Sequence, residues 1–68
     1  MREQGVVKWF NELKGFGFIN RPAGGDLYVH RSGLGEGVAT LRDGDNVDYV
    51  VSDGPRGPVA SDVLVVPA

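Results

Sequence analysis

The stretch KGFGFI, residues 14–19, carries two phenylalanines that are two positions apart. Side chains of an extended strand alternate between the two faces of a sheet, so Phe16 and Phe18 point to the same side. Gly15 and Gly17 leave the opposite side of the strand almost bare. The two rings therefore belong either to the protein interior or to an exposed apolar surface, and this stretch alone does not decide between them.

The stretch LYVH, residues 27–30, decides between them through its own alternation. Tyr28 and His30 share one face of this strand, whereas Leu27 and Val29 share the other. A buried histidine needs hydrogen-bond partners, so an interior built from Leu27 and Val29 is the less costly arrangement. Pairing the two strands as a hairpin then places both phenylalanines beside Tyr28 and His30 on the outside.

Glycines and prolines occur every few residues along the chain, as is typical of a small all-β protein with short strands and turns. It contains 11 glycines and four prolines and shows no sustained helical periodicity. Five strands without a helix to cover a sheet face bury a core best by closing into a barrel, which also hides the strand edges. We therefore expect an all-β, five-stranded antiparallel barrel that forms a single domain over residues 1–68. The expected strands are 5–11, 15–21, 27–31, 47–52 and 59–66, with one helical turn near Ser32 in the connection 32–46 and frayed ends at 1–4 and 67–68.

The predicted interior is aliphatic and is nearly complete without the rings of KGFGFI. We expect Leu41 to close one end of the barrel and Tyr49 to pack at an end. The remaining interior candidates are Val7, Ile19, Leu27, Val29, Val47, Val51, Val63 and Val65.

Composition limits the class of protein. A chain of 68 residues is too short for two cores, and it buries only about 60% of its unfolded surface. It has no cysteine, which excludes disulfides and thiolate metal sites and fits a reducing compartment. No apolar run approaches the roughly 20 residues of a membrane span, and the first residues lack the apolar stretch of a signal peptide. We expect a soluble, cytoplasmic protein, with a monomer as the simplest state.

Charge is distributed unevenly along the chain. The net charge is −2, but residues 1–31 carry five basic and three acidic side chains, whereas residues 32–68 carry two basic and six acidic ones. Five of the six aromatic residues also lie in the basic first half. A local surface of aromatic and basic side chains can hold a nucleic acid even when the whole protein is acidic.

Four segments resemble the cold-shock domain of bacterial cold shock proteins. They are VKWFN (7–11), KGFGFI (14–19), LYVHRS (27–32) and GPRGPVASDV (54–63), and the resemblance extends from Gly5 to about Val66. It implies an OB-fold barrel that binds single-stranded RNA and DNA without catalysis. By this resemblance the stacking residues are Trp9, Phe16, Phe18, Tyr28 and His30, and the further polar or phosphate contacts come from Lys8, Lys14, Asp26 and Arg56.

The chain departs from the family pattern at several positions. Tyr28 stands where phenylalanine is usual, which keeps the ring and adds a hydroxyl. Arg31 and Val38 stand where the family often has further aromatic residues. We therefore expect an intact central site with shortened ends, with Arg31 compensating by stacking on a base or pairing with phosphate. The apolar Leu13 in the first turn, together with Val38, points instead to a protein contact.

Other functions fit the sequence less well. An RRM domain also carries a motif like KGFGFI, but it needs two helices, and this sequence predicts none. In an RRM the second RNA-binding motif precedes the first, whereas in this chain the stretch around His30 follows KGFGFI. His30 has no second ligand or nucleophile to pair with, so we expect no catalysis, no metal and no cofactor. The main alternative is a small barrel that acts as a protein-interaction module with weakened nucleic-acid binding.

Overall fold

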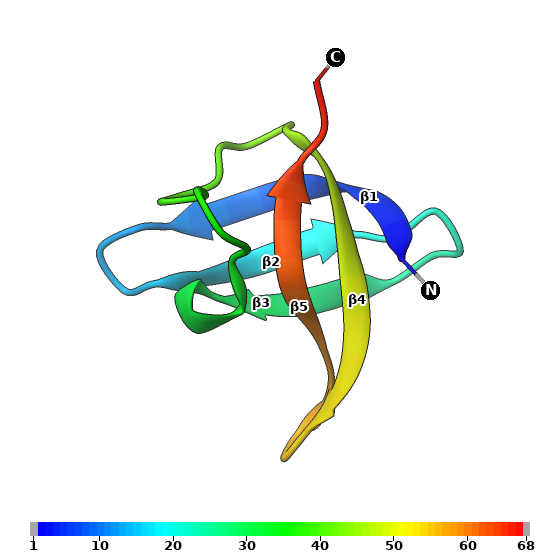
Figure 1. Ribbon diagram of the computed structural model, residues 1–68. Coiled ribbons are helices and arrows are strands. Elements are labelled where there is room, and N and C mark those ends of the chain that lie inside the picture. The colour runs from blue at the N-terminus through cyan, green and yellow to red at the C-terminus, as the bar shows by residue number, and fades with distance from the viewer. Residues whose placement is uncertain (1, 68) are drawn as a thin grey trace.

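The computed structural model describes residues 2–67 and contains all five expected strands (Figure 1). The predicted helical turn near Ser32 is a short 3₁₀ helix. The prediction of a frayed segment at residues 1–4 is wrong for Glu3 and Gln4, because both belong to the first strand. Met1 and Ala68, which were also predicted to be frayed, lie outside the described residues. The elements are β1 (Glu3–Asn11), β2 (Phe16–Asn20), β3 (Asp26–His30), η1 (Arg31–Gly33), β4 (Asn46–Gly54) and β5 (Gly57–Val65).

The strands form a closed barrel in the order β1-β2-β3-β5-β4. Strands β1, β2 and β3 follow one another as antiparallel neighbours, and the long β4–β5 hairpin crosses them steeply and extends beyond them (Figure 1). The expectation of a wholly antiparallel barrel was wrong at one seam, where β3 and β5 run parallel. Five strands cannot alternate in direction around a closed ring, because an odd number leaves two neighbours pointing the same way.

The core lies inside this barrel and contains no polar side chain among the described residues. The structure corrects the predicted interior at Val51 and Val65, which are 37% and 44% exposed, and adds Ala60. Tyr49, which was expected to pack at an end of the barrel, is fully buried. The β4–β5 pairing shifts register between Asp48 and Val50, because β5 has one extra residue there, so Ala60 and Val63 both face inward although they are three positions apart. The buried residues are Val7, Ile19, Leu27, Val29, Leu41, Val47, Tyr49, Ala60 and Val63.

A second irregularity positions Trp9. Val7 and Trp9 are two residues apart, so simple alternation would place both on one face of β1. The β1–β2 register shifts between them: Val7 pairs with Ile19, whereas Trp9 pairs with Phe18. This β-bulge allows Val7 to be buried while the Trp9 ring joins the phenylalanines on the outer face.

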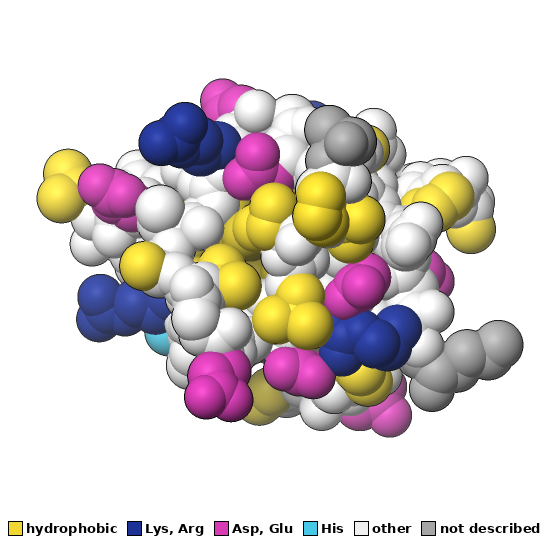
Figure 2. Space-filling model, turned by 45° about the horizontal axis from the view of Figure 1, so that its top comes forward, with side chains coloured by type: hydrophobic (Ala, Val, Ile, Leu, Met, Phe, Trp, Pro, Cys, Tyr) yellow, Lys and Arg dark blue, Asp and Glu magenta, His cyan; other side chains and the backbone are white. Residues whose placement is uncertain are grey.

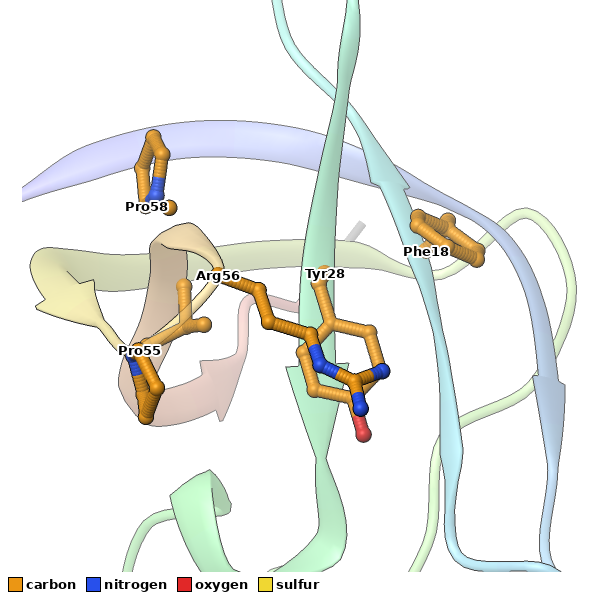
Figure 3. Close-up of a pocket in the computed structure, with 7 residues that line it drawn as sticks. Phe18, Tyr28, Pro55, Arg56 and Pro58 are labelled. Atoms are coloured by element: carbon orange, nitrogen blue, oxygen red, sulfur yellow. The ribbon is translucent and has the colours of Figure 1, made fainter.

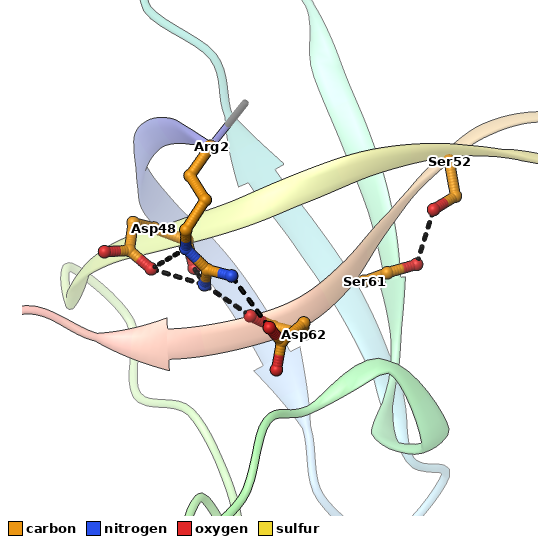
Figure 4. A network of polar contacts seen from close by, with 5 residues as sticks. All are labelled: Arg2, Asp48, Ser52, Ser61 and Asp62. Carbon is orange, nitrogen blue, oxygen red and sulfur yellow. Dashed lines mark hydrogen bonds and ion pairs between the residues drawn. The ribbon is translucent and has the colours of Figure 1, made fainter.

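Two polar networks hold the start of the chain. Glu3 accepts two hydrogen bonds from Arg21, at 2.9 and 3.0 Å, and one from the Tyr49 hydroxyl at 2.6 Å. The hydrogen bonds from Arg21, and then from Tyr49, lower the pKa of Glu3, while burial raises the pKa of Tyr49. Arg2, which directly precedes β1, reaches Asp48 on β4 and Asp62 on β5, as Figure 4 shows.

Figure 4 also shows a hydroxyl pair between the same two strands, in which Ser61 donates to Ser52 at 2.9 Å. Asp62 adopts a left-handed conformation with φ of 50°, which is unusual for a residue other than glycine. Its carboxylate and its carbonyl oxygen both accept from Arg2. Arg2 therefore binds the β4–β5 hairpin at Asp62, where the backbone of β5 is irregular.

Within residues 2–67, no helix is long and apolar enough to cross a membrane.

Candidate nucleic-acid interface

Four aromatic rings form one cluster on the outer face of β1–β3, which we call the ring cluster: Trp9, Phe16, Phe18 and Tyr28. The Trp9 ring meets Phe16 and Phe18 edge-on, with centroids 5.5 and 5.4 Å apart. The Tyr28 ring stacks on Phe16 at 6.0 Å and meets Phe18 edge-on at 5.9 Å. All four are partly exposed, so the ring cluster is an apolar surface and not part of the core.

The β2–β3 register produces this cluster. Phe16 lies opposite His30 and Phe18 lies opposite Tyr28, while Ile19 and Leu27 pair on the buried side. The predicted outward placement of Phe16, Phe18, Tyr28 and His30 on one face is therefore confirmed.

The glycines of KGFGFI allow the strands to lie close beneath the rings. A Cβ atom at Gly17 would overlap the carbonyl oxygen of Trp9 and would lie 2.7 Å from the Cα of Phe10. Gly15 has φ of 77°, and a Cβ there would lie 2.8 Å from Cδ of Arg31. A larger residue at either position would push β1 or Arg31 away from β2.

His30 is held by its neighbour Ser32. The backbone N–H of Ser32 donates to Nδ1 of His30 at 3.1 Å, and the Ser32 hydroxyl lies 2.9 Å from the same nitrogen. These contacts cap η1 and fix the orientation of the imidazole beside Phe16. The sequence prediction included His30 but did not include Ser32 as its partner. The sequence His-Arg-Ser at the end of the strand could have indicated this contact, because a serine two residues after a histidine can reach its ring.

Lys8 and Asp26 form an ion pair. The Lys8 Nζ lies 3.0 Å from Oδ2 of Asp26, and both side chains remain about half exposed. These two residues were predicted as separate polar contacts, whereas the structure joins them. In the unbound protein, the carboxylate of Asp26 already neutralises the ammonium group of Lys8.

Lys14 and Arg31 lie at the other end of the strands, near the β1–β2 turn. The backbone N–H of Lys14 donates to Oδ1 of Asn11 at 2.9 Å, and the backbone N–H of Arg31 donates to the carbonyl oxygen of Gly15 at 2.8 Å. Both side chains are exposed, and neither forms an ion pair within the described residues. They are thus two uncompensated positive charges close to the ring cluster.

Arg56 approaches the ring cluster from the β4–β5 turn. Figure 3 shows its side chain extending toward Tyr28 in a groove of about 540 Å³. The groove also contains residues that the sequence analysis treated only as a turn. Its lining consists of Phe18, Tyr28, Pro55, Arg56, Gly57, Pro58 and Val59. The two prolines on either side of the Arg56–Gly57 pair were the available signal, because they restrict the backbone that presents the guanidinium group.

Leu13 and Val38 differ in their environments. Leu13 is 92% exposed at the tip of the β1–β2 turn. Val38 is half-buried, packs against the core and lines a second groove with Leu64 and Val65. Among residues 2–67, no group of three histidine, aspartate or glutamate side chains is arranged to hold a metal ion.

The fold and the surface together define a class: small closed five-stranded barrels with exposed aromatic and basic side chains on three adjacent strands. Comparison with known proteins identifies the family. The model of the 'Cold-shock' DNA-binding domain matches residues 3–66, and the chain belongs to this family. Members of the family bind single-stranded nucleic acids and are not enzymes, so the chain is a non-catalytic protein of a nucleic-acid-binding family.

Curated relatives match over almost their whole length. The chain is 50% identical over 66 residues to the major cold shock protein CspA of Pseudomonas aeruginosa, covering 96% of each chain. It is 50% identical to the cold shock-like protein CspC of Escherichia coli, covering 93% of this chain and 94% of the relative. A cold shock-like protein of Thermotoga maritima is 45% identical over 64 residues, covering 93% and 97%.

A solved structure supports the fold. The Drosophila protein described as Unr CSD456 superposes with a TM-score of 0.81 at 22% sequence identity. The match covers 98% of this chain and 27% of that one. At this identity the likeness establishes the OB-type barrel and nothing further.

Proposed function

We propose that this protein binds single-stranded RNA or DNA through the ring cluster and the basic side chains around it. It acts in the cytoplasm as a monomer, either as an RNA chaperone or as a regulator of transcription or translation. The observation that carries the proposal is the ring cluster itself. Four aromatic side chains contact one another on the outer face of β1–β3, while the barrel interior is filled without them.

The rings supply most of the binding energy in this proposal. Every base has a π-face, and each base that stacks on an aromatic side chain contributes about 1–3 kcal/mol, as judged from alanine substitution. Bases in a duplex already stack on each other and offer no free face. The surface therefore prefers unpaired strands, and binding competes with base pairing without consuming ATP.

The polar residues have distinct roles. Lys14, Arg31 and Arg56 are available to pair with phosphates, and the guanidinium groups can also stack on bases. Lys8 and Asp26 present a donor and an acceptor side by side, so a base or phosphate that engages one of them changes the contact to the other. His30, held by Ser32, adds a further planar ring next to Phe16.

Fluorescence of Trp9 tests the proposal directly, because it is the only tryptophan in the chain. Adding an oligothymidine at low salt is expected to quench Trp9, since its ring lies in the ring cluster. No quenching at low salt would contradict nucleic-acid binding and would favour the alternative of a protein-interaction module.

Phe16→Ala and Phe18→Ala separate a binding surface from a core. Each is expected to weaken binding by about 1–3 kcal/mol while lowering the free energy of unfolding by less than about 1.5 kcal/mol. Val51→Ala is the matched control, because Val51 is an exposed apolar residue away from the rings and its truncation leaves affinity unchanged. A stability loss of about 3–5 kcal/mol for either phenylalanine would identify it as a core residue instead.

A further inference from the structure

Two apolar features of the surface lie outside the ring cluster. The first is Leu13, whose side chain is 92% exposed. The second is a groove of about 560 Å³ in which Val38, Leu64 and Val65 are the apolar residues. Figure 2 shows apolar side chains gathered in the middle of the face it views, with both acidic and basic side chains around them.

We propose that these two features bind each other in different copies of the protein, with Leu13 of one molecule entering the groove of a second. The groove is open to solvent, and at about 560 Å³ it has room for a leucine side chain and the turn residues beside it. Its full lining is Glu36, Gly37, Val38, Ala39, Thr40, Leu64 and Val65. An exposed apolar side chain that complements a pocket elsewhere on the same protein is a recognised source of self-association.

The charges around the two features are complementary. Glu36 is the one charged residue in the lining of the groove. Leu13 is followed by Lys14, and Arg31 lies against Gly15 at the base of the same turn. Glu12 is the one acidic residue of the turn and opposes the attraction. Lys14 or Arg31 of one copy can therefore pair with Glu36 of another.

The β1–β2 turn is held in a fixed shape. Asn11 accepts the backbone N–H of Lys14 with its side chain, at 2.9 Å, and the backbone N–H of Gly15 with its carbonyl oxygen, at 2.7 Å. The groove wall is also tied to the barrel, because Gly35 donates to the carbonyl oxygen of Val63 at 2.7 Å. Two surfaces that are already ordered lose little conformational entropy when they meet.

The contact is small, so the association is weak. One leucine and one or two exposed ion pairs fall far below the area of a stable interface, which implies a dissociation constant on the order of 1 mM. The protein remains monomeric when dilute and associates when it is concentrated or when copies are held close together. Because the contact joins two different surfaces, it can form a reciprocal pair or an open row of molecules.

The test uses two variants and no nucleic acid, so its result does not depend on the proposed function. Leu13→Ser removes the inserted side chain, and Ala39→Lys blocks the groove and opposes Lys14. Both positions are exposed, so both variants are expected to fold. The readouts are translational diffusion and the backbone amide shifts of Val38, Leu64 and Val65 by NMR, between about 0.05 and 2 mM protein.

The wild-type chain is expected to diffuse more slowly and to shift these amides as its concentration rises. Each variant alone is expected to weaken association by roughly tenfold or more. An equimolar mixture is expected to recover association, because the intact groove of Leu13→Ser accepts the intact turn of Ala39→Lys. Glu12→Gln is expected to strengthen association of the otherwise unchanged chain.

Three results would overturn the proposal. The first is a wild-type chain whose shifts and diffusion do not depend on concentration up to about 2 mM. The second is association that persists in either single variant, which would place the contact on another surface. The third is a mixture of the two variants that stays monomeric, because the contact would then not join the turn of one copy to the groove of another.

Discussion

The barrel has one tyrosine in the β1–β3 half, Tyr28 on β3, and one in the β4–β5 half, Tyr49 on β4, and the two differ in their exposure to solvent. Tyr28 is 36% exposed and contacts two other exposed rings, whereas Tyr49 is fully buried and its hydroxyl donates to Glu3. Strands β1–β3 thus place the four rings of the ring cluster outside, while the fifth aromatic residue, Phe10, packs against a mainly aliphatic core. The β4–β5 half places its one aromatic residue in the core and presents acidic groups on the surface.

The difference shows how a chain of 68 residues can hold both a core and an exposed aromatic surface. A barrel this small has few interior positions, and the β4–β5 half fills its share with Val47, Tyr49, Ala60 and Val63. The four rings of the ring cluster are then not needed to fill the core.

The strongest way to break the comparison is to truncate each tyrosine in turn. Tyr49→Ala is expected to lower the free energy of unfolding by about 3–5 kcal/mol, because it leaves a cavity in the core. In a domain this small, that is a large share of the total stability. Tyr28→Ala is expected to cost less than about 1.5 kcal/mol of stability but to weaken binding of an oligothymidine by about 1–3 kcal/mol. Urea unfolding and Trp9 fluorescence titration measure the two effects, and equal stability losses would contradict the division.

Salt dependence sharpens the comparison by locating the charges that bind. With Lys14, Arg31 and Arg56 at phosphates, raising monovalent salt from 50 to 200 mM is expected to weaken binding about 20-fold. Lys14→Gln, in the β1–β2 turn, is expected to reduce the slope of log affinity against log salt by about 0.7. Arg42→Gln, in the acidic half, is the matched control and leaves the slope unchanged. An equal change of slope for both variants would mean that the two halves are not distinct.

The smallest expected effect is a pH dependence of stability that comes from Glu3. Hydrogen bonds from Arg21 and Tyr49 lower the pKa of Glu3 in the folded state below its ordinary value of 4.5. The unfolded chain therefore binds the proton more readily, so this contribution is present above pH 4.5 and is lost as the pH falls through the lower folded value. Glu3→Gln is expected to flatten the fall of the unfolding midpoint below pH 4.5, whereas Glu36→Gln leaves it in place. Identical acid profiles for the wild type and Glu3→Gln would exclude this contribution.

The first three strands could be predicted from the sequence because their alternation is mostly regular. Period 2 in KGFGFI and LYVH gave a register in which Phe16, Phe18, Tyr28 and His30 share the outer face, and the structure has that register. The outward position of Trp9 did not follow from alternation. It depends on a bulge between Val7 and Trp9, and the residue pattern contains no mark of that bulge.

The β4–β5 hairpin was predicted less well for the same physical reason. Val51 and Val65 had the right spacing for the interior but are exposed, and Tyr49 and Ala60 are buried. A register shift and the left-handed backbone at Asp62 break the alternation of β5 between Ala60 and Val63. Val51 and Val65 keep the spacing of their buried neighbours, and alternation alone does not show that they are exposed. Contacts between distant segments, such as Lys8 with Asp26 or Arg56 beside Tyr28, depend on the closed barrel and not on any local pattern.

The parallel seam between β3 and β5 makes the aromatic surface inseparable from the half of the protein that carries no part of the ring cluster. Only two residue pairs form this seam, Tyr28 with Val59 and Val29 with Ala60, and the members of each pair are 31 positions apart in the chain. Strands β1–β3 alone would form an open meander with Val29 and Leu27 uncovered, and such small open sheets are barely stable in water. A peptide containing only the ring cluster would therefore lack its shape, and the smallest unit that can present these rings is the whole barrel.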